Sequence, residues 1–389
     1  MKTTYLFNPE NDMALACASV YYLAPRNVRK MAADMAPLPF WYAEGGDSTV
    51  LLHDEAQLEW MRNEVPEALK KTMCVQGILN FAPDTKQVSP WGWNPALCYL
   101  LQKECAGVKM PSTMEMEKIR QLSGRKTAVE LLPSLQRKGT IGESAVLHTL
   151  NEVDLFVAAH PKVLLKAPWS GSGRGILPVE GECTVAMHGW VKHVLTVQGY
   201  VVGEPFYERV ADFALEFKAL PGELKFVGYS MFDTDTHGAY KGNLLASNAA
   251  ILKELSVYIA TKEIEEICET LLTILPNYIK GIYTGYLGVD MMICRLSDGS
   301  FAIHPCVEIN WRMNMGLVAR FFYDRFVDDL SRGNYYTEFY ASPGEALQQH
   351  KERMEAHPLL LQGGKIKSGY LSLTPVYEQT QYQAYVVIG

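Results

Sequence analysis

The sequence predicts an α+β protein built around antiparallel hairpins, with a small α/β domain in front of it. Two strand-like runs at 286–295 and 300–310 flank Ser297-Asp298-Gly299, which is a strong signal for a hairpin turn. Short strands alternate with helical segments over residues 1–110, and this alternation is typical of an α/β domain. We therefore expect an N-terminal α/β domain at 1–112, a central domain at 113–331, and a C-terminal helix and strands at 332–389 that pack on the central domain.

Turn and capping signals locate the elements of the N-terminal domain. Gly45-Gly46-Asp47 separates two short apolar runs, and Asp54 fits the N-cap of the helix that follows, in which Pro66 is an awkward interior residue. Asn94 and Pro95 fit the N-cap and first turn of another helix. The expected elements are a strand at 3–7, helices at 12–20 and 27–36, strands at 40–44 and 49–53, and helices at 54–71 and 94–106.

The rest of the chain mixes helices with strand pairs. Pro221-Gly222 joins two runs that we predict as antiparallel strands, and a glycine-rich segment at 170–175 joins another pair as a hairpin tip. The expected helices are 113–121, 124–137, 143–158, 184–197, most of 247–279, 316–331 and 343–356. The expected strands, besides the 286–310 hairpin, are 162–168, 176–180, 211–220, 223–232, 366–373 and 382–388.

Composition and charge exclude several classes of protein. Hydrophobic residues make up 48% of the chain and charged residues 20%, which is a globular composition. No apolar run reaches the roughly 18 residues of a membrane span, and the polar residues 8–12 interrupt any secretory signal. The net charge of −7 repels phosphate backbones, so we expect no nucleic-acid partner.

The eight cysteines indicate a reducing compartment. None forms a CxxC pair, and most lie in apolar stretches. This pattern favours reduced, buried thiols over disulfides or a zinc site. We therefore expect a cytoplasmic protein.

The most informative segment is the second strand of the 286–310 hairpin. Alternate residues of a strand share a face, so Glu308, Asn310 and Arg312 lie on one side together with His304 and Cys306. On the partner strand, Asp290 can approach Glu308 if the register is right. Two carboxylates and an amide oxygen are the hard ligands that magnesium prefers, and an arginine adds a fixed positive charge for an anionic transition state. The alternative is a solvated polar face of a hairpin.

A second constellation begins at Lys166. This lysine lies on the apolar run KVLLKAP, where a lysine is costly unless it meets an anion. The segment SGSGRG at 170–175 follows it, and glycines let backbone N–H groups approach phosphate closely. The segment matches neither a Walker loop nor a Rossmann fingerprint. Its alternative reading is an ordinary flexible turn.

Together these two constellations resemble the ATP-grasp superfamily. Its members carry a lysine on a strand before a glycine-rich hairpin, then a hinge that binds adenine, then a hairpin that holds two magnesium ions. This chain reads VLLKAPWSGSGRGI, then GYVVGEPFYERVADFALEF, then GYLGVDMMI…VEINWR, in that order. The resemblance covers 113–331 and implies two α+β subdomains that clasp ATP, behind a small α/β N-terminal domain.

The resemblance also implies roles for single residues in nucleotide binding. Lys166 would contact the α- and β-phosphates, and a second phosphate lysine would be Lys126, with Arg125 as its competitor. Glu204 would meet the adenine amino group and Phe206 would supply backbone contacts. The residues of the glycine-rich segment that would cover the triphosphate are Ser170, Gly171, Ser172, Gly173 and Gly175. Asp212 matches an acidic position that touches ribose.

The metal and catalytic positions carry over in the same way. Asp290, Glu308 and Asn310 would hold magnesium, with Glu308 bridging two ions, and Arg312 matches an arginine that follows the asparagine in many members. The polar stretch 232–247 corresponds to a loop over the active site, where Lys241 and Tyr240 would contact phosphate or substrate; an ordinary surface loop is the alternative. The polar residues 8–12, after the first strand, are further candidates for substrate contact.

The implied activity is ATP- and magnesium-dependent ligation of a carboxylate to an amine through an acylphosphate. Gly288 stands where D-alanine–D-alanine ligases carry an arginine, which speaks against a close relative of those enzymes. Trp311 replaces a proline that is common in the superfamily, so the path of that loop is open. A phosphotransferase on the same fold and a nucleotide-binding protein without catalysis are the alternatives. Dimers are common among similar proteins, so a homodimer is one possible state, and the sequence leaves the oligomeric state open.

Overall fold

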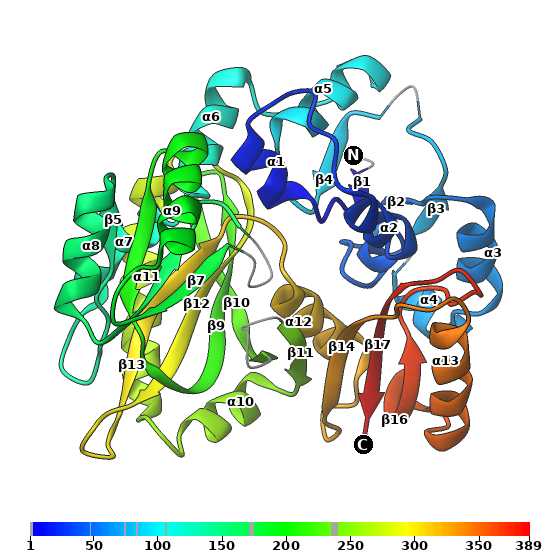
Figure 1. Ribbon diagram of the computed structural model, residues 1–389. Helices are drawn as coiled ribbons and strands as arrows, with labels where there is room; N and C mark the ends of the chain where they lie inside the picture. The colour runs from blue at the N-terminus through cyan, green and yellow to red at the C-terminus, as the bar shows by residue number, and fades with distance from the viewer. Residues whose placement is uncertain are drawn as a thin grey trace.

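The computed structural model describes residues 3–46, 48–73, 75–82, 85–105, 107–170, 175–234 and 240–389. The described residues form three sheets flanked by helices (Figure 1). No helix among them is long and apolar enough to cross a membrane. The seven cysteines in these ranges are all free.

The N-terminal domain is a parallel α/β unit, as predicted. Its four strands lie in the order β3-β2-β1-β4, and each pair is parallel. The strands are β1 Thr3–Leu6, β2 Thr49–Leu51, β3 Gln76–Ile78 and β4 Gln87–Pro90. The helices before residue 113 are α1 Asn11–Cys17, α2 Arg26–Asp34, the 3-10 helix η1 Leu38–Trp41, α3 Glu55–Asn63, α4 Glu67–Met73 and α5 Pro95–Glu104.

Two local predictions in this domain were wrong, and proline explains both. The run expected as a strand at 40–44 overlaps η1, in which the Phe40 N–H donates to the Pro37 carbonyl at 2.9 Å. Pro37 and Pro39 have no N–H to give to a sheet ladder. The helix expected at 54–71 is divided into α3 and α4 around Pro66. By contrast, Asn94 caps α5 as predicted, since its side chain accepts from the Leu97 N–H.

A small antiparallel sheet forms one side of the central domain. Its order is β5-β8-β6-β7, with β5 Ala145–Leu147, β6 Lys162–Lys166, β7 Ile176–Glu180 and β8 Val201–Pro205. Helices α8 Leu150–Ala159 and α9 Val185–Gln198 accompany it at the left of Figure 1. The continuous helix predicted at 143–158 is instead β5 followed by α8, because Thr149 caps α8 through the Glu152 N–H.

The second sheet of the central domain has nine strands and is antiparallel throughout its named pairs. Its order is β13-β12-β9-β10-β11-β14-β17-β16-β15. The strands are β9 Glu208–Leu220, β10 Glu223–Thr234, β11 Tyr240–Leu245, β12 Gly285–Arg295, β13 Phe301–Asn310, β14 Gly333–Phe339, β15 Leu360–Gln362, β16 Lys365–Ser372 and β17 Tyr382–Ile388. The helices after residue 112, besides α8 and α9, are α6 Thr113–Leu122, α7 Lys126–Leu135, α10 Asn248–Leu255, α11 Thr261–Ile279, α12 Met315–Phe326 and α13 Glu345–Ala356.

This sheet continues across the domain boundary expected at 331. Strand β14 pairs with β11 of the central domain on one side and with β17 on the other. The 332–389 segment therefore extends the central sheet. The N-terminal domain is joined to the same part, since Trp41 donates to the Leu373 carbonyl at 2.7 Å and packs on Phe322 and Phe326.

Strand alternation gives the nine-stranded sheet one apolar face and one face that carries polar side chains, called the polar face below. On β9, Phe213, Leu215 and Phe217 are fully buried in the core that α7 and α11 share. Asp212 and Glu216 have the opposite parity and so lie on the other face. Burial of the first face fixes the register, and this in turn aligns the polar residues of the neighbouring strands.

Candidate active site

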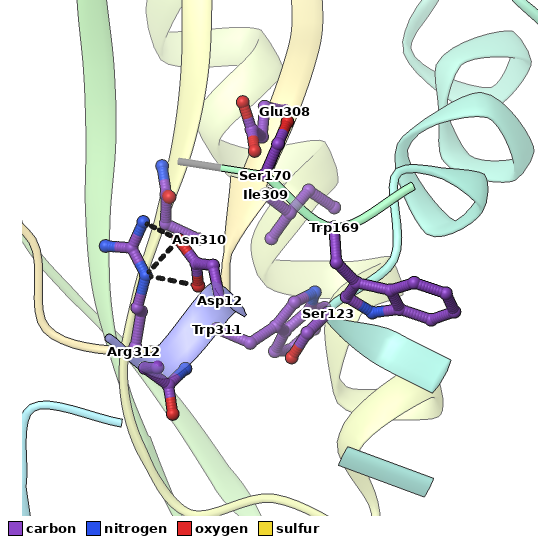
Figure 2. Close-up of a pocket in the computed structure, with 10 residues that line it drawn as sticks. Asp12, Ser123, Trp169, Ser170, Glu308, Ile309, Asn310, Trp311 and Arg312 are labelled. Atoms are coloured by element: carbon purple, nitrogen blue, oxygen red, sulfur yellow. Dashed lines mark hydrogen bonds and ion pairs between the residues drawn. The ribbon is translucent and has the colours of Figure 1, made fainter. Parts of the chain in front are cut away.

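A pocket lies where the N-terminal domain meets the end of β13 (Figure 2). Helix α1 contributes its first residues, and β13 and the loop after it contribute most of the rest. The residues that line it are Asn11, Asp12, Ser123, Trp169, Ser170, Glu308, Ile309, Asn310, Trp311 and Arg312. Four of the positions predicted from the sequence, Ser170, Glu308, Asn310 and Arg312, therefore line one pocket.

The three predicted metal ligands lie on two paired strands. In the register of β12 and β13, Asp290 is opposite Glu308, and Asn310 donates to the Asp290 carboxylate at 2.9 Å. Desolvation, followed by the like charge of Glu308, raises the pKa of Asp290 well above its ordinary value. Two carboxylates held together in this way are stabilised by a cation between them, so the set fits magnesium.

Arg125 reaches the same site from the start of α7. It is 5% exposed, and its guanidinium lies 2.7 Å from a Glu308 carboxylate oxygen. It also donates to the Ala167 carbonyl at 3.0 Å and to the Ser170 hydroxyl at 3.1 Å. Burial opposes its charge, but the carboxylates of Glu308, Glu204 and Asp12 together outweigh burial and raise the pKa of Arg125. The guanidinium therefore stays charged between the β6 end and the acidic hairpin.

Lys166 and Glu204 form a buried ion pair beside this cluster. Each is 3% exposed, and the Lys166 ammonium donates to the Glu204 carboxylate. They lie on the adjacent strands β6 and β8, in which Leu164 is opposite Glu204. Taking two charges out of water costs free energy. This cost has to be offset by contacts with the surrounding protein or with a bound ligand.

Arg312 is engaged by the N-terminal domain. Its guanidinium donates to both carboxylate oxygens of Asp12, at 2.9 Å and 2.7 Å (Figure 2). Although burial opposes the shift, Arg312 lowers the pKa of Asp12. The side chains remain 15% and 22% exposed, so the pair borders the pocket and stays within reach of a solute. The polar residues predicted after the first strand thus reach the site through Asn11 and Asp12.

Other predicted residues lie farther from this cluster. The Lys126 side chain is 53% exposed and pairs with Glu130 at 3.6 Å along α7, whereas its neighbour Arg125 faces the site. Phe206 is 49% exposed, and its N–H is taken by the Lys162 carbonyl at 2.8 Å. Glycines 171 and 173 and Ser172 lie outside the described residues, and only Ser170 and Gly175 of that segment can be placed.

Asp212 lies on the polar face of the large sheet, and Lys241 lies at an irregular point of its strand β11. Asp212 is opposite Met292, two residues from Asp290 on β12, and its carboxylate binds Arg209 at 2.9 Å and Thr234 at 3.1 Å. Lys241 is exposed at a β-bulge, where the register of β10 and β11 shifts. A β-bulge next to an active site can turn a side chain toward a ligand. The position of Lys241 is compatible with contact to a ligand bound on the polar face of the sheet.

Sequence reasoning missed a buried carboxyl on β9, beside the metal hairpin. Glu216 is 1% exposed and accepts from Ser230 at 2.8 Å and from Asn314 at 2.9 Å. Burial raises its pKa to about 7. The signal was present, because a glutamate in the apolar run ADFALEFKAL is as costly as the lysine in KVLLKAP. Asn314 also caps α12, so Glu216 helps to hold the segment that carries Arg312.

The Glu216 carboxyl also explains why a glycine, Gly288, stands two residues before Asp290. A Cβ on Gly288 would lie 2.4 Å from the Asn314 amide nitrogen and 2.5 Å from a Glu216 oxygen. No side chain fits there without displacing a buried hydrogen-bonded group. The absence of an arginine at this position therefore follows from the local packing.

Comparison with known proteins gives the fold. Neither a protein-family model nor a curated protein sequence matches the chain. Among solved structures, a biotin carboxylase from Campylobacter jejuni in a β,γ-ATP complex has a similar structure. The similarity covers 99% of this chain and 87% of the carboxylase chain, with 11% sequence identity and a TM-score of 0.52. A second similar structure is the biotin carboxylase domain of 2-oxoglutarate carboxylase from Hydrogenobacter thermophilus, a dimer with MgADP, ADP and bicarbonate. The similarity covers 100% of this chain and 86% of that domain's chain, with 11% sequence identity and a TM-score of 0.51.

These similarities extend over almost the whole chain. They confirm the ATP-grasp fold that the sequence predicts, including the N-terminal α/β domain in front of it. At such low identity they carry the fold alone, so the activity has to be argued from the site.

Proposed function

We propose that this protein is an ATP- and magnesium-dependent ligase that joins a carboxylate to an amine and releases ADP and phosphate. One observation carries the proposal. Buried cations and an acidic hairpin, from segments more than a hundred residues apart, meet around one site: Lys166 and Arg125 on one side, Asp290 and Glu308 on the other. A chain that only needed a stable core would not benefit from collecting such charges, because each is costly to desolvate.

The nucleotide would lie between the small sheet and the metal hairpin. Asp290, Glu308 and Asn310 would hold two magnesium ions, and bound magnesium would neutralise the phosphate oxygens. Lys166 would exchange its contact with Glu204 for the α- and β-phosphates, which frees Glu204 to accept from the adenine amino group. These assignments are supported by the placement of both residues on one face of the small sheet.

The second phosphate contact is better assigned to Arg125 than to Lys126. Arg125 is the cation that reaches Glu308 and Ser170, and a planar guanidinium binds phosphate oxygens in pairs. Phe206, Asp212 and the segment from Ser170 to Gly175 remain proposed contacts to adenine, ribose and triphosphate.

The chemistry requires little from side chains beyond charge and position. A carboxylate oxygen of the substrate attacks the γ-phosphorus, and the bond to ADP breaks. The amine then attacks the acyl carbon, phosphate leaves with the oxygen that attacked, and the amine loses a proton. Arg312 is 15% exposed beside the metal hairpin and would stabilise the negative charge that develops on the acyl group. Lys241 would contact phosphate or substrate from the β10–β11 bulge.

The proposal is tested by a screen for ADP release. Purified protein with magnesium and ATP is offered amino acids, dipeptides and small carboxylic acids, singly and with amines, and products are identified by mass. We expect ADP release that requires both an acid and an amine, and its loss in Glu308→Gln. A stable phosphorylated product from one substrate would assign the protein to the phosphotransferases, and nucleotide binding without turnover would remove the catalytic assignment.

The proposal also covers the oligomeric state and the cellular location of the protein. A homodimer is suggested by the biotin carboxylase domain dimer described above, and light scattering tests it. A cytoplasmic location is supported by the free state of the seven described cysteines.

A further inference from the structure

Three potential metal ligands of different chemistry lie together on the small subdomain. Within the described part of the chain, the ligand atoms of Asp154, Cys183 and His188 all lie within 4.8 Å of one another. The Nε2 atom of His188 is 2.7 Å from a carboxylate oxygen of Asp154. Asp154 belongs to α8, Cys183 to the turn after β7, and His188 to the first turns of α9. None of the three takes part in the site described above.

The start of α9 explains why the thiol and the imidazole meet. Thr184 is the N-cap, and its side chain accepts from the Met187 N–H at 3.3 Å. Cys183 is therefore the residue before the cap and His188 the fourth residue of the helix. These two positions pack against each other at many helix starts. Asp154 then approaches from the neighbouring helix, so three separate backbone positions converge.

The cluster lies on the far side of the small sheet from the nucleotide site. On β6, Val163 and Leu165 are fully buried in the core that α8 and α9 share with the sheet. Lys166 has the opposite parity, so it points away from these helices. A ligand of the Asp154–Cys183–His188 cluster is therefore distinct from the nucleotide and its magnesium.

The donor set selects for a particular class of ion. A thiolate, an imidazole and a carboxylate suit zinc, which takes four ligands and keeps a water where the protein supplies three. The Asp154 and His188 side chains are 51% and 35% exposed, so an ion can enter and hold water. Burial and the charge of Asp154 raise the pKa of the Cys183 thiol. A cation bound to the sulfur would deprotonate the thiol.

We propose that Asp154, Cys183 and His188 form a site for one zinc ion, with water as the fourth ligand. The ion would cross-link α8 to the start of α9 and so fix the helices that back the small sheet. The competing explanation is a simple ion pair between His188 and Asp154, with Cys183 close by.

The test uses the full-length protein, stripped of metal with a chelator and free of any affinity tag. Calorimetric titration with zinc should give one site per chain. Cobalt in place of zinc should give the visible bands of a tetrahedral ion and a thiolate-to-cobalt charge-transfer band. Cys183→Ser should abolish the charge-transfer band, and His188→Gln and Asp154→Asn should each weaken zinc binding by at least about tenfold.

Two matched controls make the result specific. Cys17→Ser removes an exposed thiol elsewhere, and His193→Gln removes an exposed imidazole from the same helix. Both should bind zinc like the wild type, and circular dichroism should show that all variants are folded. Absence of stoichiometric zinc binding in the wild type, or equal binding by the Cys183 and Cys17 variants, would overturn the proposal. Because the cluster and the nucleotide site lie on opposite faces, the outcome is independent of the proposed ligase activity.

Discussion

Replacing Glu216 by glutamine should stabilise the protein at alkaline pH and have little effect at acidic pH. The pKa of Glu216 is raised from its ordinary 4.5 to about 7, chiefly by burial. Each pKa unit corresponds to about 1.4 kcal/mol, so holding this group ionised in the folded state costs about 3 kcal/mol. The folded-state pKa is the higher one. Stability from this group is therefore fully present below pH 4.5 and is lost as the pH rises through about 7.

Glutamine can keep both hydrogen bonds of the carboxyl. The Asn314 amide must remain the donor, because its own oxygen accepts from the Leu317 N–H at 2.8 Å. The glutamine oxygen would therefore face Asn314, and its NH2 group would face the Ser230 hydroxyl, which can reverse from donor to acceptor. The substitution thus removes a buried charge with little change in packing.

The assay is urea unfolding of wild type and Glu216→Gln, followed by tryptophan fluorescence in chelator-containing buffers. The variant should be more stable by about 3 kcal/mol at about pH 8, and the gain should shrink by most of that amount at about pH 5. Glu223→Gln is the matched control: it removes a carboxylate that is 56% exposed on β10 and should change stability by at most about 0.5 kcal/mol at every pH. A difference that is independent of pH, or a Glu216 variant less stable than wild type at alkaline pH, would refute the reasoning.

Two further predictions concern the same region. Gly288→Ala should lower stability by about 2 kcal/mol, measured by the same unfolding assay, because its Cβ would meet two buried hydrogen-bonded groups at 2.4 Å and 2.5 Å. A variant as stable as wild type would show that the packing there is loose. Arg125→Gln should weaken binding of magnesium and ADP by about tenfold or more in calorimetry, whereas Lys126→Ala should leave it within about twofold. The reverse order would return the phosphate contact to Lys126.

The metal hairpin was predictable because it depends on local signals. A strong turn sequence fixes two strands, and strand alternation then assigns Glu308 and Asn310 to one face. The register that brings Asp290 opposite Glu308 was left open by the sequence, and burial of the other face of β12 and β13 decides it. A lysine in an apolar strand likewise pointed to Lys166 without any knowledge of its partner.

The choice between Arg125 and Lys126 could not be made from the sequence. The two are adjacent at a helix start, and successive residues of a helix point about 100° apart. Which of them faces the site depends on how the chain enters α7. In the structure, the Arg125 N–H donates to the Pro168 carbonyl at 3.1 Å, and this contact with the end of the β6 segment sets the entry angle.

The contribution of the N-terminal domain depends on contacts between distant segments. Asp12 and Arg312 are 300 residues apart, and their pairing requires α1 to lie against the end of β13. The sequence indicates that residues 8–12 follow a strand, where ligands often bind, but it does not indicate which of them reaches the pocket. Only the packing of the domains answers that question.

The central claim, an acylphosphate intermediate, is tested most directly by oxygen transfer. The acid identified by the ADP-release screen is prepared with both carboxylate oxygens as oxygen-18, and the products are analysed by mass spectrometry. The account predicts one labelled oxygen in the released phosphate for each amide formed, because the oxygen that attacks the γ-phosphorus leaves with phosphate. Released phosphate without label, or a phosphorylated product that retains both labelled oxygens, would contradict it.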